Sequence, residues 1–296
     1  MSTFTAVDLS KLPVPDVFEQ LSFEQLLAQR VAELHLYLPN VLLLESEPLY
    51  KLLQASAYRE LILREQFNQR AKGLLLAYAQ HGDLDHLAAP FGVTRQLLTP
   101  ADPVTGTPAV YEDDAAFRRR IQLAPEGLSV AGPEGAYIFH ALGADPRVLD
   151  ASAISDAPGV VRVSILSREG DGSASSELIT AVDAALSADS VRPLTDYVIV
   201  QTVEVVAFAI DASVYTFAGP DAQVVLGEAR RRLQAYVDDS HRIGRDVTRS
   251  GLFAALHVEG VQRVELHAPL ADIAVTATQA SHCTSITLTN GGVGDD

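Results

Sequence analysis

The stretch EDDAAFRRRIQLAPEGLSVAGPEGAYIFHALGADPRV, from Glu112 to Val148, marks the place where the chain changes its hydrophobic period. Before it, apolar residues recur at every third or fourth position, as they do along one face of a helix. After it, apolar and polar residues alternate, which is typical of strands with one buried face. The stretch therefore predicts helices in the N-terminal part of the chain and sheets in the C-terminal part.

Two short helices are predicted within the stretch itself. The first runs from Asp113 to Leu123, is opened by acidic residues and stops near Pro125. The second runs from Pro133 to Leu142 and lies between two glycines, with proline at its first position.

Three consecutive arginines in the first of these helices are unusual in such an acidic chain. Asp114 and Arg118 are four residues apart, so we expect them to pair along the helix surface. Arg119 and Arg120 lie at other angles, and we expect at least one of them to contact an acidic surface of another subunit. On this interpretation, replacing both with glutamate leaves the isolated fold nearly unchanged and impairs assembly. The alternative is a solvated helix face or a salt bridge within the chain.

Two longer helices are predicted nearer the N-terminus, from Leu21 to about Leu38 and from about Glu47 to Gln80. The second carries apolar surface on two sides, because Tyr58, Ile62 and Leu76 lie away from its main apolar stripe. Either this helix is fully buried within one chain, or it is shared with a partner subunit in a bundle. On the second interpretation these three residues form a partner interface.

The rest of the chain repeats a pattern of strand, glycine-containing loop and amphipathic helix. We therefore predict an α+β protein with an N-terminal long-helix bundle region over 1–96 and a linker with two short helices over 97–144. Two small α+β subdomains with mixed sheets follow, over 145–203 and 204–296. The last segment, after Leu270, is predicted to add two short strands and to end in a flexible tail.

Composition excludes several classes of function. The formal net charge of −16 argues against a nucleic-acid surface, which needs clustered basic residues. Cys283 is the single cysteine and has no partner for an internal disulfide. The first residues lack the basic start and apolar run of a signal peptide, and the longest apolar segment is too interrupted to span a bilayer. We expect a cytoplasmic protein without a membrane span.

The search for catalytic chemistry finds little. His81, Asp83, Asp85 and His86 include possible metal ligands, but their spacing crosses a helix break and capping explains the aspartates, so we expect no metal. The loop GDGSASS precedes a helix but lacks the lysine of a phosphate-binding loop, and Ser175 or Ser176 is interpreted as an ordinary N-cap. No serine has the G-x-S-x-G context. We predict no cofactor and no catalytic residue.

Several motifs, in the same order along the chain, resemble those of one family. They are GDLDHLAAPFGVTR from Gly82, the opening stretch extended to EDDAAFRRRIQLAPEGLSVAGPEGAYIFHALGADPRVLDASA, then PGVVRVSIL and VRPLTDYVIV. The chain is similar, from about residue 20 to 290, to the baseplate assembly protein J family of contractile-tailed phages and phage-tail-like bacteriocins.

This resemblance implies a structural protein and not an enzyme. Two copies of the J-type protein would join one I-type partner in a wedge, and six wedges would surround a central hub, near a sheath initiator. The wedge would hold the baseplate ring closed and transmit the trigger for sheath contraction. Assembly would take place in the bacterial host cytoplasm. The alternative from another class is a soluble enzyme that binds a small anionic ligand in its α+β half, and a third is a bacterial adaptor unrelated to tails.

Overall fold

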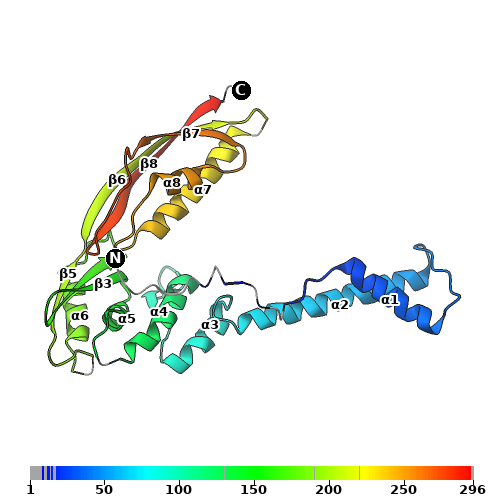
Figure 1. Ribbon diagram of the computed structural model, residues 1–296, viewed down its shortest axis with the longest axis horizontal. Helices are drawn as coiled ribbons and strands as arrows, with labels where there is room; N and C mark the ends of the chain where they lie inside the picture. The colour runs from blue at the N-terminus through cyan, green and yellow to red at the C-terminus, as the bar shows by residue number, and fades with distance from the viewer. Residues whose placement is uncertain are drawn as a thin grey trace. The chain divides into compact units, whose positions relative to one another are not determined.

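A computed structural model of the chain describes residues 18–294 except 130, 190 and 220, together with residues 9, 12, 13 and 15 (Figure 1). Its internal contacts divide these residues into two compact units. The helical unit comprises the described residues up to Arg95 together with Asp113–Arg118, and the sheet unit comprises Gln96–Glu112 and the described residues from Arg119 onward.

A helical hairpin forms most of the helical unit. Helix α1 spans Phe23–Tyr37 and helix α2 spans Pro48–Gly73, and Ser22 caps α1 by accepting a hydrogen bond from the Gln25 amide. Arg30 of α1 pairs with Glu60 of α2. The pairing buries few side chains, which are Leu26 in α1 and Ala57 and Asn68 in α2.

Helix α2 ends earlier than the sequence predicts, at Gly73 instead of near Gln80. A Cβ atom at Gly73 would lie only 2.6 Å from the Asp83 carboxylate, so the chain passes this side chain closely. A turn follows, and helix α3, His81–Ala88, starts after the N-cap Gln80. The prediction that Asp83 caps a helix is therefore wrong, because this residue lies inside α3.

Helix α4 spans Asp114–Gly127 and helix α5 spans Glu134–Ala144. Asp113 caps α4 by accepting a hydrogen bond of 2.8 Å from the Ala116 amide. The helix does not stop at Pro125 but contains it, at the cost of one backbone hydrogen bond near its end. Phe117 and Ile121 are buried, as the spacing predicts. The 3₁₀ turn η2, Ala89–Phe91, and the short strands β1, Leu97–Thr99, and β2, Val110–Tyr111, complete this region.

The first three-stranded sheet of the sheet unit has the strand order β3-β4-β5. Strand β3, Val148–Ala157, is antiparallel to β4, Val160–Ser167, which is parallel to β5, Tyr197–Thr202. The parallel connection passes through helix α6, Ser176–Leu186. The hydrophobic core of this sheet contains strand residues such as Ile165, which pack with side chains of α5 and α6.

The second three-stranded sheet has β6, Glu204–Thr216, at its centre. Strand β7, Val261–Ala268, is antiparallel to β6, and β8, Gln279–Val293, is parallel to it. Helices α7, Ala222–Ser240, and α8, Arg249–Leu256, lie on the same side of this sheet (Figure 1). The mixed sheets and their helices confirm the predicted α+β class.

The C-terminal segment forms one long strand, so the prediction of two short strands there is wrong. Strand β8 stays beside β6 along its whole length because two extra residues, Thr284 and Gly291, bulge out of the ladder. Asp295 and Asp296, at the end of the predicted flexible tail, lie outside the described residues.

A pair of helical glycines gives a test of this packing. At Gly251 in α8, a Cβ atom would lie 2.2 Å from the Tyr236 hydroxyl oxygen, whereas at Gly227 in α7 it would meet no atom within 4 Å. We expect Gly251→Ala to lower the free energy of unfolding by about 1–3 kcal/mol, because overpacking outweighs the helix preference of alanine. Gly227→Ala, the matched control, should raise it by about 0.5–1 kcal/mol. Urea unfolding of the intact chain measures both, and equal shifts would contradict the described contact.

Candidate functional site

The arginine triplet of α4 is fully engaged within the chain, and its first member does not pair as predicted. The Arg118 guanidinium donates hydrogen bonds of 2.7 Å to the backbone oxygens of Leu76 and Ala79, in the turn after α2. Asp114 instead pairs with Arg95 at 2.8 Å. Burial raises the pKa of Asp114, but hydrogen bonds from the His81 amide and from Arg95 lower it by a larger amount. The pKa of Asp114 therefore lies below its usual value.

The other two arginines have carboxylate partners. Arg119 lies 2.8 Å from Asp150, at the start of the first sheet, and Arg120 lies 2.5 Å from Glu112. The Arg120 side chain is 11% exposed and the Glu112 side chain is fully buried. Both arginines therefore have an intrachain partner, because Asp150 and Glu112 lie next to the second half of α4 although they are outside that helix. A contact of Arg119 or Arg120 with another subunit stays a prediction.

Asp150 links the two sheets of the sheet unit. Its buried carboxylate accepts hydrogen bonds from Arg119, from the Ala151 amide at 2.9 Å and from the Ile243 amide at 3.1 Å. Ile243 follows α7, in the second half of the unit. Ser152 adds a second link by donating a hydrogen bond of 2.6 Å to the Ala277 backbone oxygen. The sequence gives no signal for either link, since the partners are far apart along the chain.

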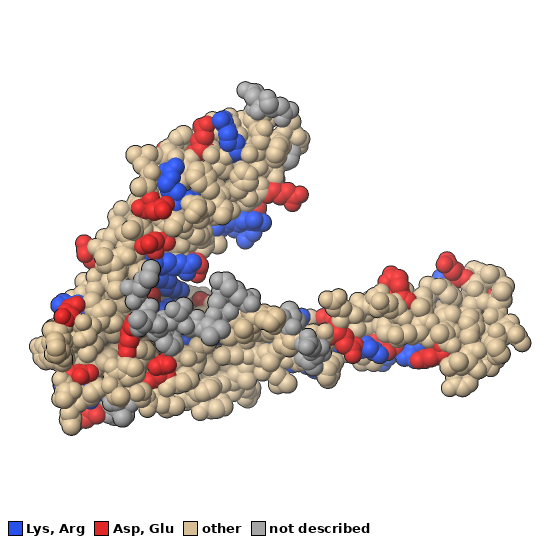
Figure 2. Space-filling model, in the orientation of Figure 1, with Lys and Arg blue, Asp and Glu red and all other residues tan. Residues whose placement is uncertain are grey.

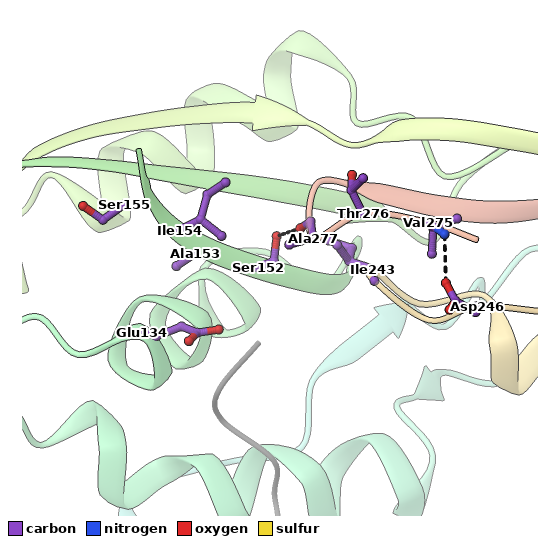
Figure 3. A pocket seen from close by; sticks show the side chains of 11 residues that line it. Glu134, Ser152, Ala153, Ile154, Ser155, Ile243, Asp246, Val275, Thr276 and Ala277 are labelled. Carbon is purple, nitrogen blue, oxygen red and sulfur yellow. Dashed lines mark hydrogen bonds between the residues drawn. The ribbon is translucent and has the colours of Figure 1, made fainter. Parts of the chain in front are cut away.

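A cavity of about 670 Å³ opens beside these links (Figure 3). It lies between β3, the start of α5, the loop after α7 and the loop before β8, and its polar side chains include Glu134, Ser152, Ser155, Asp246 and Thr276. Asp246 accepts a hydrogen bond of 2.8 Å from the Val275 amide, and Ser152 is used as described above. Asp246 and Ser152 therefore stabilise loops of the sheet unit through these hydrogen bonds.

The two loops that sequence reasoning considered for ligands have structural roles. Ser175 caps α6 by accepting a hydrogen bond from the Leu178 amide, which confirms the N-cap prediction. In the same loop, hydrogen bonds from the backbone and side chain of Ser173 lower the pKa of Asp171. With Glu177 also in the first turn of α6, this helix start carries negative charge that disfavours a bound anion.

The histidine and aspartate residues near α3 do not converge. Asp85 pairs with Arg95 at 3.0 Å. Over residues 18–294, apart from the three positions left out, no group of three or more His, Cys, Asp or Glu side chains could hold a metal ion. The expectation that no metal binds stays a prediction. Within the same residues, no helix is long and apolar enough to cross a membrane.

The largest set of unpartnered apolar side chains lies on α1, α2 and the loop that joins them. Tyr58 is 58% exposed and Ile62 is 40% exposed, so two of the predicted interface residues lie on an open surface. Leu76 is half-buried and lies in the turn after α2. Figure 2 shows few charged side chains at the end of the helical unit where α1 leads into α2. Other exposed apolar residues here are Leu36, Tyr37, Leu42, Leu44, Leu52, Leu63, Phe67 and Leu74.

Helical periodicity assigned some of these residues to a buried stripe. Leu52 and Phe67 belong to the main apolar face of α2, yet they are 68% and 64% exposed. Periodicity identifies the face that seeks cover but not what covers it. We define the apolar side chains of α1, α2 and their loop as the hairpin surface.

A modular α+β chain whose most prominent open feature is an apolar helical hairpin belongs to the class of structural proteins that act through contacts with other chains. Comparison with known proteins specifies the family. Residues 45–102 match the baseplate J-like N-terminal domain, residues 129–202 the baseplate J-like central domain, and residues 208–289 the C-terminal domain of baseplate J-like proteins. The chain therefore belongs to the baseplate J-like family of contractile tails.

One similar protein supports this assignment, and a solved structure shows a weaker likeness. The chain is 48% identical over 296 residues to baseplate protein J of Escherichia phage P2, and the match covers 97% of this chain and 98% of that one. It is 16% identical to a chain in the cryo-EM structure of the anti-feeding prophage baseplate, symmetrised sixfold. That match has a TM-score of 0.40 and covers 60% of this chain and 42% of the other, so it spans less than half of that chain.

The buried pair of Arg120 and Glu112 generates a stability prediction. Arg120→Gln removes this guanidinium from a fully buried carboxylate and should lower the free energy of unfolding by about 3–5 kcal/mol. Arg231→Gln, which breaks an exposed pair with Glu228, is the control and should cost no more than about 1 kcal/mol. Thermal and urea unfolding of the whole chain measure both. Similar small effects from the two variants would show that the buried pair contributes nothing special.

Proposed function

We propose that this chain is a wedge subunit of the baseplate, in which two copies join one I-type partner. Six such wedges then form a ring around the central hub, near the sheath initiator. In this role the chain is structural and not catalytic, and it has no nucleic acid among its direct partners. It assembles in the bacterial host cytoplasm and leaves the cell as part of a phage or a tail-like particle.

The hairpin surface carries this proposal. Only Leu26, Ala57 and Asn68 are buried within α1 and α2, so the hairpin gains little stabilisation from its own packing. Fully burying one large apolar side chain contributes about 1.5–3 kcal/mol. Burying the exposed residues of the hairpin surface against further helices would therefore contribute a large favourable free energy of association. A bundle shared between chains satisfies this requirement.

The interface we propose includes Tyr58, Ile62 and Leu76 of the helical unit. Arg119 is included as well, because its side chain is 38% exposed beside Asp150. Arg120 stays in the proposed interface as well, through the 11% of its side chain that is exposed beside Glu112. We also propose that the wedge holds the ring closed until the attachment signal arrives, and that a change of angle at the wedge then lets the sheath contract.

A substitution in α2 tests the shared bundle. When the chain is produced with its I-type partner, we expect a defined heterotrimer, whereas the chain alone should self-associate or be poorly soluble. Tyr58→Glu combined with Ile62→Glu places two charges on the hairpin surface. The yield of heterotrimer should then fall at least about tenfold, since losing about 1.4 kcal/mol of burial suffices for this.

The matched control is Gln69→Glu, an exposed polar position on the same helix, which should leave the yield unchanged. Sedimentation and size-exclusion chromatography of the co-expressed proteins measure the complex. A stable monomer of the unaltered chain that ignores the partner would refute the shared bundle.

A further inference from the structure

A second run of three arginines, Arg230–Arg232, lies in helix α7, and its surroundings differ from those of the triplet in α4. The side chains of Arg231 and Arg232 are 69% and 52% exposed, and Arg230 is also exposed. Figure 2 shows basic side chains gathered on the side of the molecule where Figure 1 places α7. The triplet in α4 contacts its own chain, whereas the triplet in α7 faces solvent.

Helix α7 packs one face against the second sheet. The apolar side chains that it buries there recur every four residues, at Val225, Ala229, Leu233 and Val237. Successive residues of a helix are rotated by about 100° around its axis. Arg231 therefore lies opposite the buried face, and Arg230 and Arg232 lie on either side of it. The three arginines together cover the exposed face of the helix.

One carboxylate serves two members of this triplet. Arg231 donates hydrogen bonds of 2.9 Å from Nε and 2.7 Å from Nη2 to Glu228, and Arg232 donates one of 3.0 Å from Nε. These hydrogen bonds lower the pKa of Glu228 to about 2, so its carboxylate stays ionised. Within the part of the chain that the structure describes, Arg230 makes no ion pair.

The exposed face of α7 is therefore basic in an acidic chain. Three guanidinium charges against the one carboxylate charge of Glu228 leave a local excess of two positive charges. The formal net charge of the whole chain is −16. Such a local excess attracts a negatively charged group to this face.

Glu228 also orients the two guanidinium groups that it contacts. A guanidinium has five N–H donors in one plane, and the hydrogen bonds to Glu228 use two of those of Arg231 and one of those of Arg232. Toward the other described residues, the remaining N–H groups of both side chains donate no hydrogen bond. Side chains that are already held in place lose less conformational entropy when a ligand binds. The two arginines are thus arranged to receive further acceptors.

Carboxylates on another protein fit this face best. Nucleic acid and anionic lipid present phosphates over a wide area, and the negative charge of the rest of the chain repels such a surface. A small inorganic anion cannot span arginines that point in three directions. A segment with several carboxylates can lie across the helix and leave the rest of the chain in solvent. Each guanidinium can then bind a carboxylate through two parallel hydrogen bonds.

We propose that the exposed face of α7 around Arg231 binds a segment rich in Asp and Glu from a different protein of the baseplate. A symmetric contact between two copies of this chain would bring two basic faces together, so a second copy is not the occupant. This surface is separate from the hairpin surface and from the residues proposed for the wedge interface. A failure of the shared bundle therefore leaves the tests below unaffected, and the reverse also holds.

Binding of an acidic peptide tests the charge recognition. The probe is a fluorescently labelled oligoglutamate with blocked ends, and its anisotropy at low salt should rise with added full-length chain, whereas an oligoglutamine of equal length should not bind. Arg230→Gln, Arg231→Gln and Arg232→Gln combined should weaken binding at least about tenfold, because three charged contacts are lost together. The melting curve of this variant should stay unchanged, since all three side chains are exposed.

The matched control replaces Arg162, Arg245 and Arg263 with glutamine. These arginines lie elsewhere in the sheet unit, each is paired with a carboxylate, and their loss changes the net charge by the same amount. This variant should bind the oligoglutamate within about twofold of the unaltered chain. Equal weakening in the two variants would overturn the proposal, because the peptide would then respond to net charge alone. So would an unaltered chain that does not bind the peptide.

Photo-cross-linking in assembled particles identifies the occupant. Gly227→benzoylphenylalanine places a reactive group next to Glu228, at a position where a Cβ atom would meet no atom within 4 Å. We expect a cross-link to a segment of another baseplate protein that contains several Asp or Glu residues. Three outcomes would overturn the proposal: a cross-link to a second copy of the chain, a cross-link to a segment without carboxylates, and complete particles that give no cross-link.

Discussion

A single buried carboxylate, Asp150, determines how the sheet unit is put together. It extends from the first sheet, accepts a guanidinium hydrogen bond from α4 and accepts a backbone amide hydrogen bond from the segment after α7. A carboxylate removed from water is tolerated only when such donors surround it. Each donor comes from a different part of the chain, so the three parts must be in place together. This requirement makes two small sheets and a helix behave as one unit.

Neighbouring charge reinforces the same arrangement. Arg242 directly precedes Ile243, whose amide donates a hydrogen bond to Asp150. Burial lowers the pKa of the Arg242 guanidinium, and the negative charge of Asp150 opposes that effect. His241, one residue earlier, makes a 2.6 Å hydrogen bond through Nδ1 to the Ser281 backbone oxygen in β8. Local polar contacts thus connect the segment that binds Asp150 to strand β8.

Sequence patterns were sufficient where structure depends on local periodicity. The paired strands β3 and β4, the cap of α6 at Ser175 and the helices α7 and α8 all follow from alternation, helical spacing and capping. Sequence patterns failed where a residue far away along the chain determines the local structure. Helix α2 ends at Gly73, which lies close to the distant Asp83, and the arginines of α4 find partners up to 42 residues away. Strand β8 is continuous because bulges absorb its extra residues, which no periodicity reveals.

The candidate interface was only partly predictable for a similar reason. Tyr58 and Ile62 were identified from the second apolar face of α2, and both are exposed. Leu52 and Phe67, on the main apolar stripe of α2, are also exposed, because a stripe of apolar residues does not specify whether its cover comes from the same chain. The arginine triplet was misjudged because its acidic partners, Glu112 and Asp150, lie outside its own helix.

The sparse packing between α1 and α2 also has a consequence for the life of the chain before assembly. A hairpin held by few buried side chains opens locally at low cost, and a locally opened segment is a substrate for proteases. Association through its apolar side chains, as we propose, would close that route, since opening would then require the complex to come apart first. Copies that meet no partner would then be the ones exposed to degradation.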